Sequence, residues 1–437
     1  MIKKILYSNT SWSLFSNGTT ALLGFVNLGF IAHQYSRDDA GKWFMLLTVY
    51  TLLEMLRSGW VQTPFVRYFA VSINHEEKNR LIGASWQLLL GFTIIIALLA
   101  LPFMYFFKLD NGAFLLAKRF TIFWLFSALP YQLLQWQLQA SQLFKKLAVV
   151  KIFFAAGFTI LLLFQVKLRF SIETVVLLYG CLQFGIGMVG SIFGWLRFGT
   201  WKTNLQIERR RLSAFGRYSM FTMVTSSLLR SSDQFIIALW LGPAAVAVYS
   251  VPQKLIEAIE IPVRSFASVT MPKAASLFQQ QKSEELKLLF YKQCGFLTAL
   301  IFPMLVVFLI FPSHIVNLLG GGKYHESALL LQIFCFYAAL IPIDRFCGVL
   351  LDAGNRPQKN TMKVLIMLAT NVSLDVFALW MGAGIYGVAA GSTITFLLGV
   401  IVGWVQLKDV LDTFAIKLFW KHGVLASVNL LRKIPAA

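Results

Sequence analysis

The sequence carries little charge for its length. Only 13% of its 437 residues are Asp, Glu, Lys or Arg, whereas soluble domains carry about 25%. Hydrophobic residues make up 57% of the chain, and the mean hydropathy is +0.69. This composition excludes a large soluble domain. It predicts an all-α membrane protein that crosses the bilayer many times.

Acidic residues are the scarcer kind of charge. The 19 Asp and Glu stand against 39 Lys and Arg, which gives a net charge of +20. In a soluble protein this excess would suggest nucleic acid as a partner. Here the basic residues lie mostly in short loops between apolar runs, where the positive-inside rule explains most of them. Nucleic acid is therefore not an expected partner, and a basic cavity for an anionic substrate accounts for the remainder.

Residues with the spacing of a catalytic or metal site are also missing. The four cysteines are scattered through apolar runs, and the five histidines form no ligand pattern. Two G-x-G-x-x-G matches, at Gly185 and Gly382, follow no strand, so they indicate helix packing and a turn rather than a dinucleotide site. The sequence thus predicts no metal, no organic cofactor and no enzyme.

The apolar runs indicate about 12 spans, since each span with its loop takes roughly 35 residues. We expect a six-helix lobe over residues 1–196, a basic linker over 197–214, a second lobe over 215–406 and a basic tail over 407–437. The first span is read as an uncleaved helix rather than a signal peptide. The expected spans are Trp12–His33, Trp43–Phe69, Leu81–Phe107, Phe120–Ser141, Leu147–Val166, Ile172–Leu196, two helices from Phe215 to Met271 joined at Leu241–Ala244, Phe290–Phe311, Ser327–Leu351, Thr361–Trp380 and Tyr386–Gln406. A polar helix, Lys273–Lys287, and a loop, Pro312–His325, are expected between spans.

The distribution of Lys and Arg predicts the orientation. With the N-terminus inside, the inside segments hold roughly 26 of them and the outside loops roughly 8. Both termini are therefore expected on the cytoplasmic side of a bacterial inner membrane.

The paired helices between Phe215 and Met271 carry charges at membrane depth, where each costs several kcal/mol unless it faces protein or water. Arg230 and Asp233 are spaced to pair along one helix. Glu257, Glu260 and Arg264 share one face of the next, which leaves two acids for one base. One acid would then stay unpaired and be able to take a proton. Either these groups only join helices, or they line a polar pathway.

Three stretches of the sequence carry a family resemblance. The stretch from Asp233 through Leu241-Gly242-Pro243 to Tyr249 is similar to a phrase of polysaccharide exporters, with Gln234 and Ala247 departing from the usual residues. The turn Ala353-Gly-Asn-Arg-Pro357 and the stretch from Asn371 to Gly384-Ile-Tyr-Gly387 resemble later phrases of the same family, in the same order. The chain thus resembles the Wzx-type flippases of O-antigen and capsule repeat units, in the superfamily that includes the MATE transporters.

The resemblance implies a V-shaped, two-lobed fold and a substrate class. It implies a flippase that moves undecaprenyl-diphosphate-linked oligosaccharide across the inner membrane for lipopolysaccharide, capsule or exopolysaccharide assembly. It also implies contact with membrane lipid and, as protein partners, a polysaccharide polymerase and chain-length proteins. Arginine suits bidentate phosphate contact. The candidate diphosphate and sugar ligands are Arg57, Arg230, Arg264, Arg345, Asn17 and Asn27. The candidate carboxylates for H⁺ or Na⁺ coupling are Glu54, Asp233, Glu257, Glu260, Asp344 and Asp375.

Three alternatives remain open. A MATE-like exporter of cationic drugs would want an acidic cavity and often an Asp in its first helix, which has no acidic residue here. A lipid II flippase usually has about two more spans than this count of about 12. A membrane-bound oligosaccharide polymerase would need a large outside loop, and the outside loops here are short.

Overall fold

The structure is a computed structural model that describes residues 9–72, 74–106, 112–200 and 204–411. Every regular element within these ranges is helical, which confirms the all-α class. The start of the chain and the tail beyond residue 411 lie outside the described residues, so the expected basic tail is seen only in its first few residues. The chain forms two compact units, Met1–Ala247 and Val248–Ala437.

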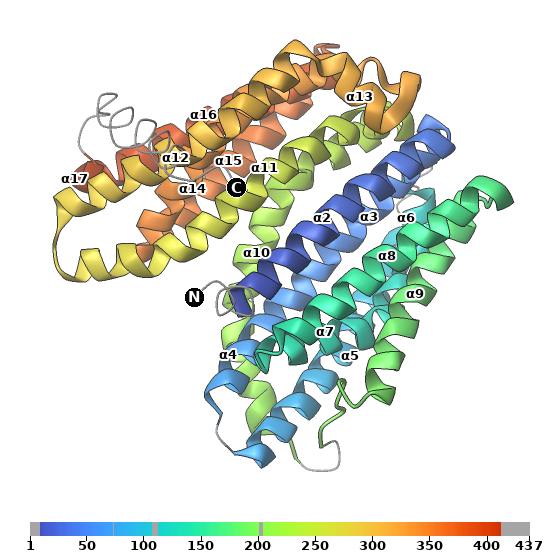
Figure 1. The fold of residues 1–437 in the computed structure, drawn as a ribbon, viewed down its shortest axis with the longest axis vertical. Helices are drawn as coiled ribbons and strands as arrows, with labels where there is room; N and C mark the ends of the chain where they lie inside the picture. The colour runs from blue at the N-terminus through green and yellow to red at the C-terminus, as the bar shows by residue number, and fades with distance from the viewer. Residues whose placement is uncertain (1–8, 73, 107–111, 201–203, 412–437) are drawn as a thin grey trace, which may run out of the picture. The chain divides into compact units, whose positions relative to one another are not determined.

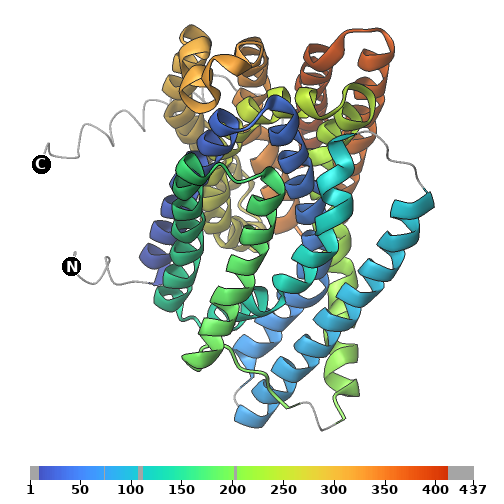
Figure 2. The same cartoon turned by 90° about the vertical axis from the view of Figure 1, so that its right-hand side faces the viewer.

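Unit 1 is a bundle in which α2 packs along α8, and α8 beside α9 (Figures 1 and 2). Its helix α10 packs on α3 and on the π-helical turn η1, so by packing it belongs with the first unit although the sequence places it in the second lobe. The lobe boundaries themselves stay a prediction. The elements of unit 1 are α2 (Asn9–Gln34), α3 (Arg37–Arg57), η1 (Ser58–Gln62), α4 (Thr63–Val71), α5 (His75–Phe106), η2 (Gly112–Phe114), α6 (Leu115–Ser127), α7 (Leu129–Ala140), α8 (Phe144–Leu168), α9 (Ile172–Ile192) and α10 (Gln206–Leu241).

Unit 2 is built around α16, which packs against both α14 and α15. Helix α11 leads into this unit and continues through three internal prolines, Pro252, Pro262 and Pro272. The elements are α11 (Pro243–Gln279), α12 (Ser283–Ile310), α13 (Pro312–Gly320), η3 (Gly321–Tyr324), α14 (Ser327–Ala353), α15 (Pro357–Trp380), α16 (Gly384–Gln406) and α17 (Lys408–Leu411).

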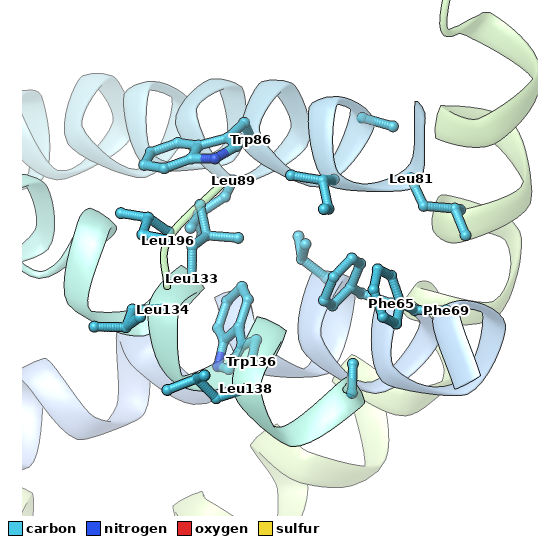
Figure 3. Packing of buried hydrophobic residues seen from close by; sticks show 14 of the residues in the cluster. Phe65, Phe69, Leu81, Trp86, Leu89, Leu133, Leu134, Trp136, Leu138 and Leu196 are labelled. Atoms are coloured by element: carbon cyan, nitrogen blue, oxygen red, sulfur yellow. The ribbon is translucent and has the colours of Figure 1, made fainter. Parts of the chain in front are cut away.

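A cluster of buried apolar residues lies at one end of unit 1. Leu81, Trp86 and Leu89 of α5 lie on one side of the cluster, and Phe65 and Phe69 of α4 lie on the other side with Trp136 and Leu138 of α7 (Figure 3). These side chains are 8% exposed or less. The cluster fixes the ends of three helices relative to one another, and so it positions the loops that connect them.

Eight described helices are long and apolar enough to cross a membrane, or nine if the bent pair α6 and α7 is one span. The twelve spans predicted from the sequence are thus not confirmed as a count. The remaining three predicted spans fall on α3 with α4, on α10 and on α11. These three carry Glu54, Arg57, Arg230, Asp233 and the charges of α11, and charged residues lower the mean hydropathy of a helix.

Several predicted helix boundaries are wrong. Helix α10 begins at Gln206 rather than at the expected Phe215, so it includes half of the segment predicted as a linker. The polar helix expected over Lys273–Lys287 is instead the end of α11 and the start of α12, separated by a turn at 280–282. The loop expected over Pro312–His325 holds α13 and η3, because Pro312 stands at the first turn of a helix, where its missing N–H costs nothing.

The kink expected at Pro64 takes the form of a π-helical turn. Proline has no N–H to bond the carbonyl of Trp60, so the ordinary helical pattern cannot pass through this position. The N–H of Thr63 bonds the carbonyl of Ser58 instead. Such insertions often mark functional sites, and this one directly follows Arg57.

Helix α10 crosses this turn at very short range. A Cβ added to Gly59 would lie 2.4 Å from the Cα of Met220, and one added to Gly216 would lie 2.1 Å from the carbonyl oxygen of Trp60. The indole of Trp60 also donates to the hydroxyl of Ser213 at 3.2 Å. Glycine is needed on both sides because backbone meets backbone at the crossing.

Gly216→Ala is therefore expected to destabilise the protein, by about 1–3 kcal/mol, as other overpacked sites do. Gly91→Ala in α5 is the matched control, because nothing lies within 4 Å of its added Cβ. The thermal unfolding midpoint in detergent should fall for the first variant and hold or rise slightly for the second. Equal midpoints would show that the crossing is not tight.

A bidentate ion pair anchors α17 to the turn before α15. Arg356 donates from Nη1 and Nη2 to the two carboxylate oxygens of Asp409, at 2.9 and 2.5 Å. These hydrogen bonds hold the pKa of Asp409 below its ordinary value. A carboxyl with a lowered pKa contributes stability above its ordinary pKa, and this contribution is lost as the pH falls through the folded value.

Acid should therefore weaken this anchor. Both side chains are substantially exposed, so the effect stays within about 1 kcal/mol. The unfolding midpoint of the unaltered protein should drop more between about pH 5 and pH 3 than that of Arg356→Gln, since only the former has a lowered pKa to lose. Parallel pH profiles for the two proteins would contradict a contribution from the pair.

Candidate functional site

Arg57 lies at the centre of a polar network inside unit 1. Its side chain is 0% exposed, and its Nη2 donates to the carboxylate of Glu54 at 2.6 Å. Its Nη1 donates to the carbonyl of Leu125 at 2.6 Å and the hydroxyl of Thr93 at 3.2 Å. The Nε has no hydrogen-bond partner among the described residues. The hydrogen bonds of this enclosed guanidinium link α3 to α5 and α6.

Glu54 collects further donors around the same charge. The hydroxyl of Ser58 donates to it at 2.9 Å, and the amide of Gln132 donates to its other oxygen. Gln132 in turn donates to the hydroxyl of Tyr50 at 3.3 Å. The attraction within a buried ion pair offsets the free energy of desolvation only when further hydrogen bonds satisfy the remaining donors and acceptors of both groups.

The break between α6 and α7 brings α7 into this network. The two helices meet at Ala128 with a bend of 46°. Pro130 lacks an N–H, so the carbonyl of Phe126 has no ordinary helical donor and the backbone pattern is interrupted at this turn. Arg57 uses the carbonyl of Leu125, and Gln132 reaches back to Glu54 from just beyond the break.

The charges of α11 form two separate pairs. Lys254 donates to Glu257 at 2.8 Å, and Arg264 contacts Glu260 at 3.3 Å. The expectation that one base serves two acids and leaves one of them unpaired is therefore wrong. Lys254, one turn before Glu257, supplies the second base.

A buried lysine pairs with Asp344 in unit 2. Lys363 of α15 is 2% exposed, and its Nζ lies 2.6 Å from a carboxylate oxygen of Asp344 and 3.0 Å from its backbone carbonyl. Lys363 was not among the residues predicted from the sequence, although it lies within the expected span Thr361–Trp380. Its partner is on another helix, so no spacing along one helix indicates the pair.

Three more predicted residues lie in polar contacts between or along helices. Asp375 is 0% exposed and accepts from the amide of Asn371 at 3.2 Å. Asn27 accepts from the hydroxyl of Thr159 at 2.7 Å, and Asn17 accepts from Lys151 at 3.2 Å. The two asparagines of α2 thus join it to α8, and their role as sugar ligands stays a prediction.

Arginines and acids differ in exposure across the predicted site. Arg230 and Arg345 are exposed, and the side chain of Arg264 is 47% exposed. The acids beside them are withdrawn: Asp233 is 5% exposed, and the side chains of Glu260 and Asp344 are 16% and 17% exposed. These basic heads are accessible while these three carboxylates lie against the protein; Glu257 differs from them, since its side chain is 41% exposed beside Lys254. Arg57 is the exception, since it is enclosed.

Comparison with known sequences identifies the protein family. The profile of the polysaccharide biosynthesis protein family matches residues 6–278, more than half of the chain. The chain belongs to that family. An uncharacterized membrane protein of Methanocaldococcus jannaschii is 21% identical over 428 residues, which covers 92% of this chain and 83% of the relative.

Solved structures show the same fold. An inward-closed lipid II flippase MurJ has a TM-score of 0.72 at 16% identity and covers 96% of this chain and 91% of its own. An inward-facing multidrug resistance MATE transporter of the MOP superfamily has a TM-score of 0.74 at 13% identity, with 91% and 96% covered. This member of the polysaccharide biosynthesis family is thus a multi-pass membrane protein with the fold of these transporters.

Proposed function

We propose that the protein is a flippase that moves undecaprenyl-diphosphate-linked oligosaccharide across the bacterial inner membrane. The observation that carries the proposal is the exposure of Arg264 and Arg345 while their neighbouring acids are withdrawn. An exposed arginine in a membrane helix needs water or an anion beside it, because hydrocarbon leaves its charge unsatisfied. A diphosphate supplies acceptors for the guanidinium fork.

The family and the charge pattern favour this substrate over the alternatives. Cationic drugs would want accessible carboxylates, and among the predicted site residues the accessible arginines Arg230, Arg264 and Arg345 outnumber the one accessible carboxylate, Glu257, which is paired with Lys254. Helix α2 has no acidic residue. Lipid II offers the same diphosphate chemistry, and the family's description as polysaccharide biosynthesis favours an oligosaccharide repeat unit over it. A polymerase and chain-length proteins are the partners that such a pathway implies.

We propose H⁺ or Na⁺ coupling through the carboxylates of unit 2. Glu260 pairs with Arg264, so protonation of the acid would free the arginine for a diphosphate. Glu260→Gln is expected to fold normally and to transport without responding to an ion gradient, because the amide cannot change charge. The check is flipping in proteoliposomes with and without a proton or sodium gradient. Full gradient-driven transport by this variant would remove Glu260 from the cycle.

The function itself is tested by deleting the gene in its own host. Lipid-linked oligosaccharide should accumulate in the cytoplasmic leaflet, and surface polysaccharide should be lost. Restoration by the unaltered gene is the control. If the deletion leaves surface polysaccharide intact and instead raises sensitivity to cationic drugs, the export of polysaccharide precursors is the wrong function.

A further inference from the structure

A basic cavity lies at one end of unit 1, outside the polar network around Arg57. Its volume is about 380 Å³, within the range of small-ligand sites. The ends of four helices and the segment after α9 enclose it. Its lining residues are Phe69, His75, Lys78, Asn79, Ile82, Gln137, Leu138, Ala140, Ser141, Gln142, Leu143, Lys146, Gly194, Trp195 and Arg197.

The lining has one sign of charge. Lys78, Lys146 and Arg197 are joined by His75, and no Asp or Glu is part of the wall. The nearby Glu77 of α5 is paired with Arg211 at 3.1 Å. Helices α5 and α8 both begin at the cavity, which adds the partial positive charge of their first turns. An anion inside would meet attraction from several sides.

The two lysines are held by aromatic rings rather than by acids. The Nζ of Lys78 lies 5.4 Å from the ring centre of Phe69, and the Nζ of Lys146 lies 5.2 Å from that of Trp195. Neither makes an ion pair with a carboxylate in the part of the chain that the structure describes. Cation–π contacts position an ammonium without neutralising it, so both donors stay available.

The wall of the cavity is fixed before any ligand arrives. The amide of Gln137 donates to the carbonyl of Arg197 at 2.7 Å and accepts from its N–H at 2.8 Å. The indole of Trp86 donates to the same carbonyl at 3.1 Å. Phe69 and Leu138 belong to the apolar cluster of Figure 3. The backbone of Arg197 is therefore held while its side chain is exposed at the rim.

We propose that this cavity binds a phosphorylated headgroup. The site is at the ends of α5, α8 and α9, which are candidate spans, and Trp195 follows shortly after the last residue of α9. The ends of spans are where tryptophan is enriched at membrane interfaces. Ile192, Phe193 and Phe198 are exposed around the segment that carries Arg197, where acyl chains can pack. Basic pockets at this depth suit anionic lipids. An anionic phospholipid and a soluble phosphate ester both offer the phosphate group that these basic side chains would bind.

The test measures binding by the purified full-length protein and does not depend on transport. Native mass spectrometry compares retention of phosphatidylglycerol with that of phosphatidylcholine, and glycerol 1-phosphate is the soluble competitor. Lys78→Gln with Lys146→Gln should lower retention of phosphatidylglycerol on the order of tenfold. The matched control is Lys118→Gln with Lys167→Gln, which removes the same charge from exposed positions in the same unit outside the cavity.

Each outcome decides one point. Loss in the cavity variant alone, without competition from glycerol 1-phosphate, assigns a lipid headgroup; competition assigns the phosphate ester itself. Arg197→Gln is a second variant with the same expected direction, and it leaves the backbone hydrogen bonds of Arg197 in place. Retention of phosphatidylglycerol by both cavity variants at the level of the control overturns the site. This result would leave the proposed transport function untouched.

Discussion

Arg57→Ala is expected to be the most destabilising single substitution in unit 1. The substitution removes the hydrogen-bond donors to the carbonyl of Leu125 and the hydroxyl of Thr93. It also leaves the carboxylate of Glu54, whose side chain is only 18% exposed, without its ion-pair partner. Breaking a buried ion pair by removing one partner costs about 3–5 kcal/mol. We expect low yield in the membrane and the lowest unfolding midpoint of any variant considered.

The second half of this test removes both charges. Glu54→Gln with Arg57→Met keeps hydrogen bonding at position 54 to Ser58 and Gln132 and leaves no stranded charge. The midpoint should recover most of the loss, because a well-packed neutral replacement is often no less stable than a buried pair. Arg210→Ala, at an exposed position near the start of α10, controls for loss of positive charge. A stable Arg57→Ala protein without export would instead make Arg57 a substrate ligand.

Arg264→Ala with Arg345→Ala is expected to abolish flipping while the protein remains folded. Both guanidinium groups are accessible, so their removal leaves no cavity in the core. The loss of Arg264 also takes the base from Glu260, whose side chain is 16% exposed, so some loss of stability is expected without unfolding. A hydrogen bond to a charged group contributes about 1.5–3 kcal/mol, so each arginine lost should slow translocation about tenfold or more. Flipping of labelled substrate in proteoliposomes measures the rate.

The lysine exchanges sharpen this prediction. Arg264→Lys and Arg345→Lys keep the charge and lose the planar fork, so each should recover only part of the rate. Full recovery by lysine would mean that charge alone is used. An unchanged rate in the double alanine variant would remove both residues from the substrate path, and the exposed guanidinium groups would then need another explanation.

The sequence predicted the class of the fold and most of the helices, because apolar runs and Gly or Pro turns are local signals. The turn at Gly242 and Pro243 and the bend near Pro64 were located in this way. The π-helical form of that bend was not predictable, since it depends on the carbonyl that proline leaves without a donor and on the close approach of α10.

The pairing of charges was predictable only in part. Glu54 with Arg57 and Glu260 with Arg264 follow from spacing along one helix. Lys363 with Asp344 joins two helices, and no spacing rule reports such a pair. The burial of a charged side chain was the hardest property to predict from the sequence. Arg57 and Arg345 both lie next to or near an acid within an apolar run, yet Arg57 is enclosed and Arg345 is exposed. That difference is set by what each helix packs against.

The most direct measurement of the central claim is translocation by the purified protein alone. Vesicles would carry a fluorescent undecaprenyl-diphosphate oligosaccharide, and a membrane-impermeant quencher would report the fraction in the outer leaflet. The account predicts protein-dependent movement of this lipid, with little movement of labelled phosphatidylcholine or of an undecaprenyl monophosphate sugar. Equal movement of all three lipids, or transport of a cationic drug in place of the oligosaccharide lipid, would contradict it.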